Sequence, residues 1–227
     1  MIGPIDQLII GDKASYDDFS ASMASRKIKQ PKKKIIKETV PFSNKTYDFS
    51  AINGEIYWEE RELEYVFELM ADTPEELEEL KSQFSSWVMN VQEAEIYDPF
   101  IPDYHFIGTY SDMSYEDEED VEKTTVTVIF TAYPYMIANV AKVYEVTIAA
   151  SSQTTLTILN ESMHPITPLI TSDKGLTIKI GDSSYVVGAG TVADEVLKLP
   201  IGLTTITLKN TKTTACTVEI RFFEEVG

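Results

Sequence analysis

The chain has 227 residues, a formal net charge of −18 and 43% hydrophobic residues, so it can bury a core and is not of the disordered class. A pI near 4.4 argues against nucleic acid as the main partner, because binding to phosphates depends on cations. No apolar run is long enough to span a membrane and no secretory signal is visible at the first residues, which predicts synthesis in a cytoplasm.

Residues 1–70 carry the pattern of β-structure. We expect short strands at residues 8–10 and 33–40, and a turn at Asn53-Gly54 between strands 49–51 and 56–58. Residues 61–70 alternate apolar and acidic side chains, which is typical of a strand with one buried face.

A single helix is predicted after residue 72. Thr73, Pro74 and Glu76 form an N-terminal capping sequence, with proline at the first helical position and glutamate three residues after the cap. Apolar residues then recur at helical spacing as far as Val91. We expect this apolar stripe to cover the sheet rather than to meet a membrane or a partner.

Further strands are expected at residues 95–98, 106–113 and 124–132. The last two flank an acidic run, Glu116 to Asp120, which lacks the Asp-x-Asp-x-Asp-Gly order of a calcium loop. We interpret the run as a hairpin tip or a loop that faces a partner.

The character of the chain changes near residue 140, where charge falls and threonine and serine become frequent. Eight short strands separated by turn residues then predict an antiparallel β-sandwich. The expected strands are 144–148, 154–159, 167–171, 176–180, 184–187, 195–199, 204–209 and 216–223. The predicted fold is therefore mainly β, an all-β chain with one α-helix, in two domains of residues 1–140 and 141–227.

No sequence motif for catalysis or cofactor binding is present. There is no nucleophile elbow, no phosphate-binding glycine loop and no histidine pair at metal-ligand spacing around His105 or His164. The one cysteine, Cys216, lies in a strand pattern and is expected in the core. We expect no catalytic residue, no cofactor and no metal site. Phe222 and Phe223 should point to opposite faces of their strand.

A basic cluster lies in the acidic half of the chain. Residues 26–37 hold seven lysines and arginines, whereas residues 1–140 as a whole hold 28 acidic and 12 basic side chains, a formal charge of −16. Two interpretations stay open: the cluster is half of a subunit contact, or it is a solubilising edge that discourages stray strand pairing.

The order of short motifs along residues 8–137 resembles that of the distal tail protein (Dit) family of long-tailed bacteriophages and prophages. The motifs lie at residues 11–19, 31–34, 40–42, 53–54, 61–65, 98–108 and 130–135. Asn160, Pro165 and Pro168 before a β-run resemble the galectin-like domain of that family.

The resemblance implies an N-terminal β-sandwich or barrel-like domain with a covering helix, followed by a galectin-like β-sandwich. It also implies a structural, non-enzymatic protein of the virion, made in the host cytoplasm. Its N-terminal domains would form a hexameric ring, single or as a pair of rings, that joins the tail tube to the tail-tip fibre or lysin protein or to a baseplate. DNA would pass through such a ring without specific binding.

The alternative function is a carbohydrate-binding β-sandwich with an accessory domain for host-surface attachment, and a third candidate is a glycosidase that uses an acid pair. The candidate subunit-interface residues are Lys27, Lys29, Lys32, Lys33, Lys34, Lys37, Glu116, Asp117, Glu118, Glu119 and Asp120. The start of the helix at Glu75 to Glu79 is a second acidic candidate for the counterpart of the lysines.

Overall fold

The computed structural model describes residues 6–51, 54–117, 122–181 and 183–227, and it is mainly β, as the sequence predicts. Contacts divide the chain into two compact units, residues 1–137 with Gly227 and residues 138–226. The predicted domain boundary at residue 140 stays a prediction about independent folding.

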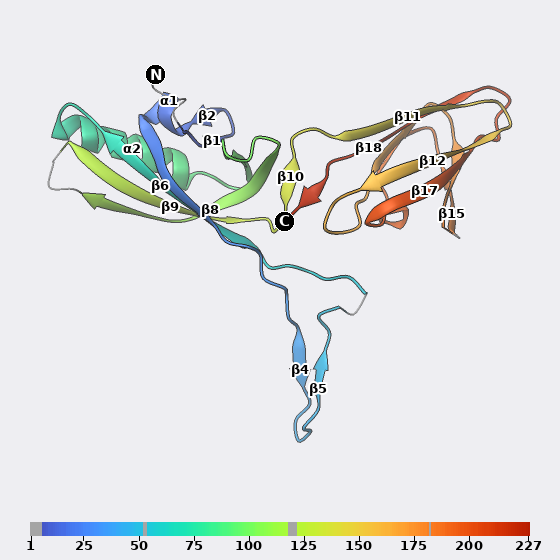
Figure 1. Cartoon of the computed structure of the whole chain (residues 1–227), viewed down its shortest axis with the longest axis horizontal. Coiled ribbons are helices and arrows are strands. Elements are labelled where there is room, and N and C mark those ends of the chain that lie inside the picture. Colours follow the sequence, from blue (N-terminus) through green and yellow to red (C-terminus); the bar gives the residue numbers. More distant parts are fainter. Residues whose placement is uncertain (1–5, 52–53, 118–121, 182) are drawn as a thin grey trace. The chain divides into compact units, whose positions relative to one another are not determined.

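The first unit is built on one large sheet, with strands in the order β2-β1-β7-β8-β9-β6-β3 (Figure 1). β10 (Met136–Ala138) pairs with β8 outside this order. The strand bounds are β1 Ile9–Ile10, β2 Lys13–Ala14, β3 Ala21–Ile28, β6 Arg61–Met70, β7 Ala94–Tyr97, β8 Tyr104–Asp117 and β9 Lys123–Ala132. The two helices are α1 Ser15–Phe19 and α2 Pro74–Met89.

The alternation in β6 positions the core of this unit. Leu63, Tyr65, Phe67 and Leu69 are buried, and they pack in one cluster with Phe84 and other apolar residues of α2. The predicted helix is confirmed, and its N-cap is Thr73, whose hydroxyl oxygen accepts a hydrogen bond from the backbone N–H of Glu76 at 3.3 Å. The apolar stripe of α2 covers the sheet, as expected.

Two strands lie outside the large sheet. Among the described residues, β4 (Lys37–Thr39) has β5 (Thr46–Asp48) as its one partner strand, so the expected strand at 33–40 is shorter and the hairpin turn falls within residues 40–45. Of the turn predicted at Asn53-Gly54, Asn53 lies outside the described residues, and the N–H of Gly54 donates to the carbonyl of Ala51 at 2.9 Å. The strands expected at residues 49–51 and 56–58 are wrong: Trp58 makes an isolated bridge to Lys33, and these residues form no strand. Phe42 takes the positive φ of 64° that the hairpin requires.

The second unit has two four-stranded antiparallel sheets, β11-β18-β13-β16 and β12-β17-β14-β15, whose buried residues form one core cluster. This is the predicted β-sandwich. The bounds are β11 Lys142–Ile148, β12 Gln153–Asn160, β13 Leu169–Ser172, β14 Leu176–Ile180, β15 Ser183–Val187, β16 Gly190–Val192, β17 Gly202–Lys209, β18 Cys216–Phe222 and β19 Glu225–Val226.

One predicted strand of this unit is wrong. Residues 195–197 form a short 3-10 helix, η1 (Glu195–Leu197), because Asp194 caps it by accepting a hydrogen bond from the N–H of Val196. The strand β16, three residues upstream, was not expected. Cys216 is buried in the core, and Phe222 is buried while Phe223 is exposed, as predicted.

Candidate assembly interface

Residues 29–60, which we call the arm, leave the large sheet at the end of β3 and return at the start of β6. The foot of the arm is held by backbone hydrogen bonds from Lys29 to Glu62 (3.0 Å), from Glu59 to Lys32 (2.7 Å) and from Lys34 to Tyr57 (2.8 Å). Within the described part of the arm, Ser50 is the one buried residue. The arm therefore has no core of its own.

The arm exposes many large apolar side chains. Phe42 at the hairpin turn is fully exposed, and Tyr47 and Phe49 stack on one face of the hairpin with ring centroids 6.4 Å apart. The exposed set in the arm is Ile35, Ile36, Val40, Phe42, Tyr47, Phe49, Ile56 and Tyr57. A high density of exposed large apolar side chains in one segment is typical of a segment that is covered by a partner.

The basic residues 26–37 fall into two groups. Arg26, Lys27 and Lys29 are paired within the chain, with Asp98, Glu64 and Glu62, at nitrogen–oxygen distances of 2.5, 4.0 and 2.5 Å. These three cations have carboxylate partners without any second molecule.

The second group lies on the arm itself. Lys32, Lys33 and Lys34 are exposed, and none of them makes an ion pair with any residue that the structure describes. Lys37 lies opposite Asp48 in the β4–β5 ladder. Hydrogen bonds from the side chain and backbone of Ser50, helped by Lys37 and Lys33, lower the pKa of Asp48.

The acidic run is only partly described. Glu116 and Asp117 belong to β8, where they pair with Thr125 and Thr124 of β9, and the Glu116 side chain is exposed. Glu118, Glu119 and Asp120 lie outside the described residues. Nothing in the described part brings this run together with the lysines of the arm.

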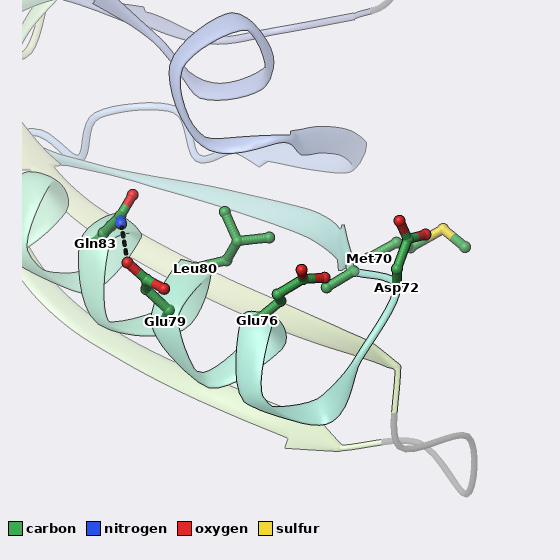
Figure 2. A pocket seen from close by; sticks show the side chains of 7 residues that line it. Met70, Asp72, Glu76, Glu79, Leu80 and Gln83 are labelled. Atoms are coloured by element: carbon green, nitrogen blue, oxygen red, sulfur yellow. Dashed lines mark hydrogen bonds between the residues drawn. The ribbon is translucent and has the colours of Figure 1, made fainter.

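The second acidic candidate lies beside a groove. The groove has a volume of about 340 Å³ and lies where the end of β6 meets the first turns of α2. It is lined by Met70, Ala71, Asp72, Glu76, Glu79, Leu80 and Gln83. In Figure 2, Asp72 and Glu76 lie at one end, Glu79 and Gln83 at the other, and Leu80 between them.

The three carboxylates of the groove are not neutralised by any cation of the described residues. Glu79 accepts a hydrogen bond from the Gln83 amide at 3.2 Å, and no ion pair joins Asp72, Glu76 or Glu79 to another described residue. The nearby Lys123 pairs with Glu68 at 3.5 Å. The groove therefore combines an apolar floor with an unneutralised acidic rim.

Sequence reasoning placed Glu76 and Glu79 among the candidates but missed Met70 and Asp72. They come into the groove only because the short connection between β6 and α2 folds the helix back along the strand. No periodicity in the sequence signals that arrangement.

A second hollow of about 620 Å³ lies on the same helix, around Trp87. The Trp87 ring stacks on Phe19 of α1 with centroids 4.7 Å apart, and the ammonium of Lys13 lies 5.3 Å from the Phe19 ring centre. Within the described residues, no three His, Cys, Asp or Glu side chains gather as metal ligands do. No helix of that part is long and apolar enough to cross a membrane.

Neither a family model nor a curated protein sequence matches the chain. Among solved structures, it is similar to the Dit protein of SPP1 (gp 19.1), described as a paradigm of the hub adsorption apparatus in phages that infect Gram-positive bacteria. That match has a TM-score of 0.67 at 13% identity and covers 96% of this chain and 99% of that one.

Two looser matches are to the baseplate of phage P2 in its activated conformation (TM-score 0.36, 9% identity, 96% of this chain and 98% of that one) and to the tail of a GTA particle (TM-score 0.31, 12% identity, 62% and 99%). Their TM-scores are too low to bear on the fold, which is therefore compared with that of the SPP1 protein. The chain has the fold of a phage distal tail protein, and the resemblance seen in its sequence is confirmed at the level of the fold.

Proposed function

We propose that the protein is a structural component of a phage tail tip, a ring-forming hub that joins the tail tube to the tail-tip fibre, lysin protein or baseplate. The observation that carries the proposal is an exposed apolar arm on a fold shared with the SPP1 Dit protein over 96% of the chain. A hexamer, as a single ring or a pair of rings, is the expected oligomer.

The arm supports self-association for a physical reason. Eight large apolar side chains in water are costly, and covering them with another copy of the chain removes their apolar surface from water. A ring needs two different, complementary patches on each copy, and the arm and the body of the first unit are two such surfaces.

The charge distribution supports the same role. The 28 acidic against 12 basic side chains of residues 1–140 give a ring whose wall would repel phosphates, which suits a conduit for DNA and does not suit specific DNA binding. The protein would then have no catalytic activity and would need no cofactor.

Light scattering on the purified full chain, together with electron microscopy of the same sample, tests the proposal. We expect a closed oligomer whose mass is a multiple of the chain, and we expect a monomer when residues 35–56 are replaced by a short Gly-Ser linker. As a control, the same Gly-Ser linker replaces residues 211–214, an exposed segment of the second unit, and this variant should still assemble. A full chain that stays monomeric, alone and with its tube protein, would overturn the proposal.

The carbohydrate-binding alternative has weaker support. Sugar sites use exposed aromatic rings, and in the described part of residues 138–226 Phe223 is the one ring that is more than one-third exposed. That ring also lies against Arg221, with 5.5 Å from the guanidinium carbon to its centre. A glycan array with the full chain, and with Phe223→Ala as control, would favour this alternative if binding is seen and depends on Phe223.

A further inference from the structure

We propose that the lysines of the arm in one copy bind in the acidic groove between β6 and α2 of the next copy. The inference rests on the proposed self-association, and it assigns the two surfaces that meet. The partner of the groove is thus a second copy of this chain, through Lys32 to Ile36.

The lysines of the arm and the Met70 and Asp72 end of the groove lie too far apart to meet within one chain. The foot of the arm is bonded to Glu62 at the start of β6, whereas Met70 and Asp72 of the groove lie at or beyond its end. A ten-residue strand spans roughly 30 Å, and the residues from Lys29 to Lys34 reach roughly 17 Å even when fully extended. The lysines of the arm therefore do not reach the Met70 and Asp72 end of their own groove, which leaves that end to the arm of another copy.

The groove and the arm segment are complementary in charge. The groove offers the carboxylates of Asp72, Glu76 and Glu79, which make no ion pair with the described residues of their own chain (Figure 2). The arm offers three exposed ammonium groups, also without an ion pair in the described residues. Lys123, a cation close to the groove, is engaged by Glu68.

The two surfaces are complementary in apolar character as well. Met70 is 62% exposed at the groove, and Leu80 lies between its acidic ends. Directly after the lysines, Ile35 and Ile36 are 62% and 44% exposed. A volume of about 340 Å³ is of the size of small ligand pockets and accommodates side chains of this segment.

The positions of the two surfaces on β6 determine how successive copies are arranged. Each copy carries one donor surface and one acceptor surface at opposite ends of β6, so the contact is heterologous and extends from copy to copy, closing into a ring where the rotation allows. The charged part of such a contact sets its register and its encounter rate, and it weakens as salt rises.

Charge reversal in the full chain tests the assignment. We expect Glu76→Lys with Glu79→Lys, and separately Lys33→Glu with Lys34→Glu, each to raise the dissociation constant for self-association at least tenfold. An equimolar mixture of the two variants should restore hetero-association to within about threefold of the unaltered chain, because the reversed charges then attract. The control is Glu75→Lys with Asp103→Lys, the same charge change at two exposed acidic residues outside the groove that make no ion pair with a described residue. Glu78 is left unchanged because it pairs with Lys81 at 2.8 Å.

Cross-linking gives a second reading that does not depend on affinity. The chain's one cysteine is buried, so Lys33→Cys and Glu76→Cys introduce the accessible thiols. A short bismaleimide should join the two variants when they are mixed, and should not join Lys33→Cys to Glu75→Cys.

The outcomes separate the groove from the proposed function. A chain that assembles, with groove variants no different from the control and no selective cross-link, would overturn the groove assignment and leave the ring proposal standing. A full chain that never assembles would overturn the proposed function, and with it the groove assignment that rests on self-association.

Discussion

At the scale of single residues, Asp98 is the centre of a buried polar contact in the first unit. Its carboxylate is almost fully buried, and it accepts hydrogen bonds from Arg26 (2.5 Å), from the Tyr65 hydroxyl (3.2 Å) and from the backbone N–H of Phe100 (2.9 Å). The guanidinium of Arg26 also lies over the Phe100 ring at 4.7 Å. Asp98 thus ties β3 and β6 to the turn that follows β7.

Replacing Asp98 with alanine should therefore strongly destabilise the first unit. We expect the free energy of unfolding to fall by about 3 kcal/mol, because the partly buried Arg26 guanidinium and the buried Tyr65 hydroxyl lose their acceptor. Urea unfolding followed by tryptophan fluorescence measures this, since Trp58 and Trp87 both lie in the first unit. The exposed Asp103→Ala is the control, and an equal loss in both variants would contradict the prediction.

A second residue-scale prediction concerns alkaline pH. Burial, together with the neighbouring charge of Asp98, raises the pKa of Tyr65 well above its usual value near 10. The folded state then keeps the phenol proton where the unfolded chain loses it, so the stability of the first unit should fall as pH rises above about 10.

Tyr65→Phe removes this titration. We expect the variant to lose about 1 kcal/mol at neutral pH, through the missing hydrogen bond to Asp98, and to show a shallower fall in stability between about pH 10 and 12. Thermal unfolding across that range measures the slope. Equal slopes for the two proteins would show that Tyr65 is not responsible.

At the scale of elements, β6 and α2 form the unit that both the core and the groove depend on. The bounds of β6 could be predicted to the residue, because one face is buried and the other carries glutamates. The start of α2 could be predicted because its capping sequence is explicit. β3 was missed, since its C-terminal half is charged and its pairing with β6 contains an irregularity between Met23 and Ser25. The 3-10 helix η1 was taken for a strand because local capping by Asp194 prevailed over strand propensity.

The capping of α2 gives a prediction at this scale. Thr73→Ala removes the hydroxyl that accepts the Glu76 N–H, and it should lower the free energy of unfolding of the first unit by about 1 kcal/mol. Thr73→Ser keeps the hydroxyl and should stay close to the unaltered protein. Urea unfolding followed by tryptophan fluorescence measures the free energy of unfolding of each variant. Identical losses in Thr73→Ala and Thr73→Ser would contradict a capping role.

At the scale of the whole molecule, two cores organise the chain. The buried apolar residues form one cluster in residues 8–132 and another in residues 148–222. Each cluster draws on its own sheets, which is the condition for two units that fold separately.

A fragment of residues 1–140 should therefore fold by itself and keep the ability to assemble. We expect cooperative thermal unfolding of the fragment, and an oligomer with the same number of copies as the full chain. Circular dichroism and light scattering measure the two properties. A fragment without a cooperative transition would place the domain boundary elsewhere or show that the second unit is required.

The sequence by itself determined the mainly β class, the position of α2, the sandwich pattern of residues 143–223 and the resemblance to distal tail proteins. Those properties depend on local periodicity, capping and motif order, which can be followed along the chain. Only the tertiary structure decided which lysines are already paired, that the arm lacks a core, and that Met70 and Asp72 join Glu76 and Glu79 around one groove. The reason is that ion pairing, exposure and concavity depend on contacts between residues distant in sequence, which no local pattern specifies.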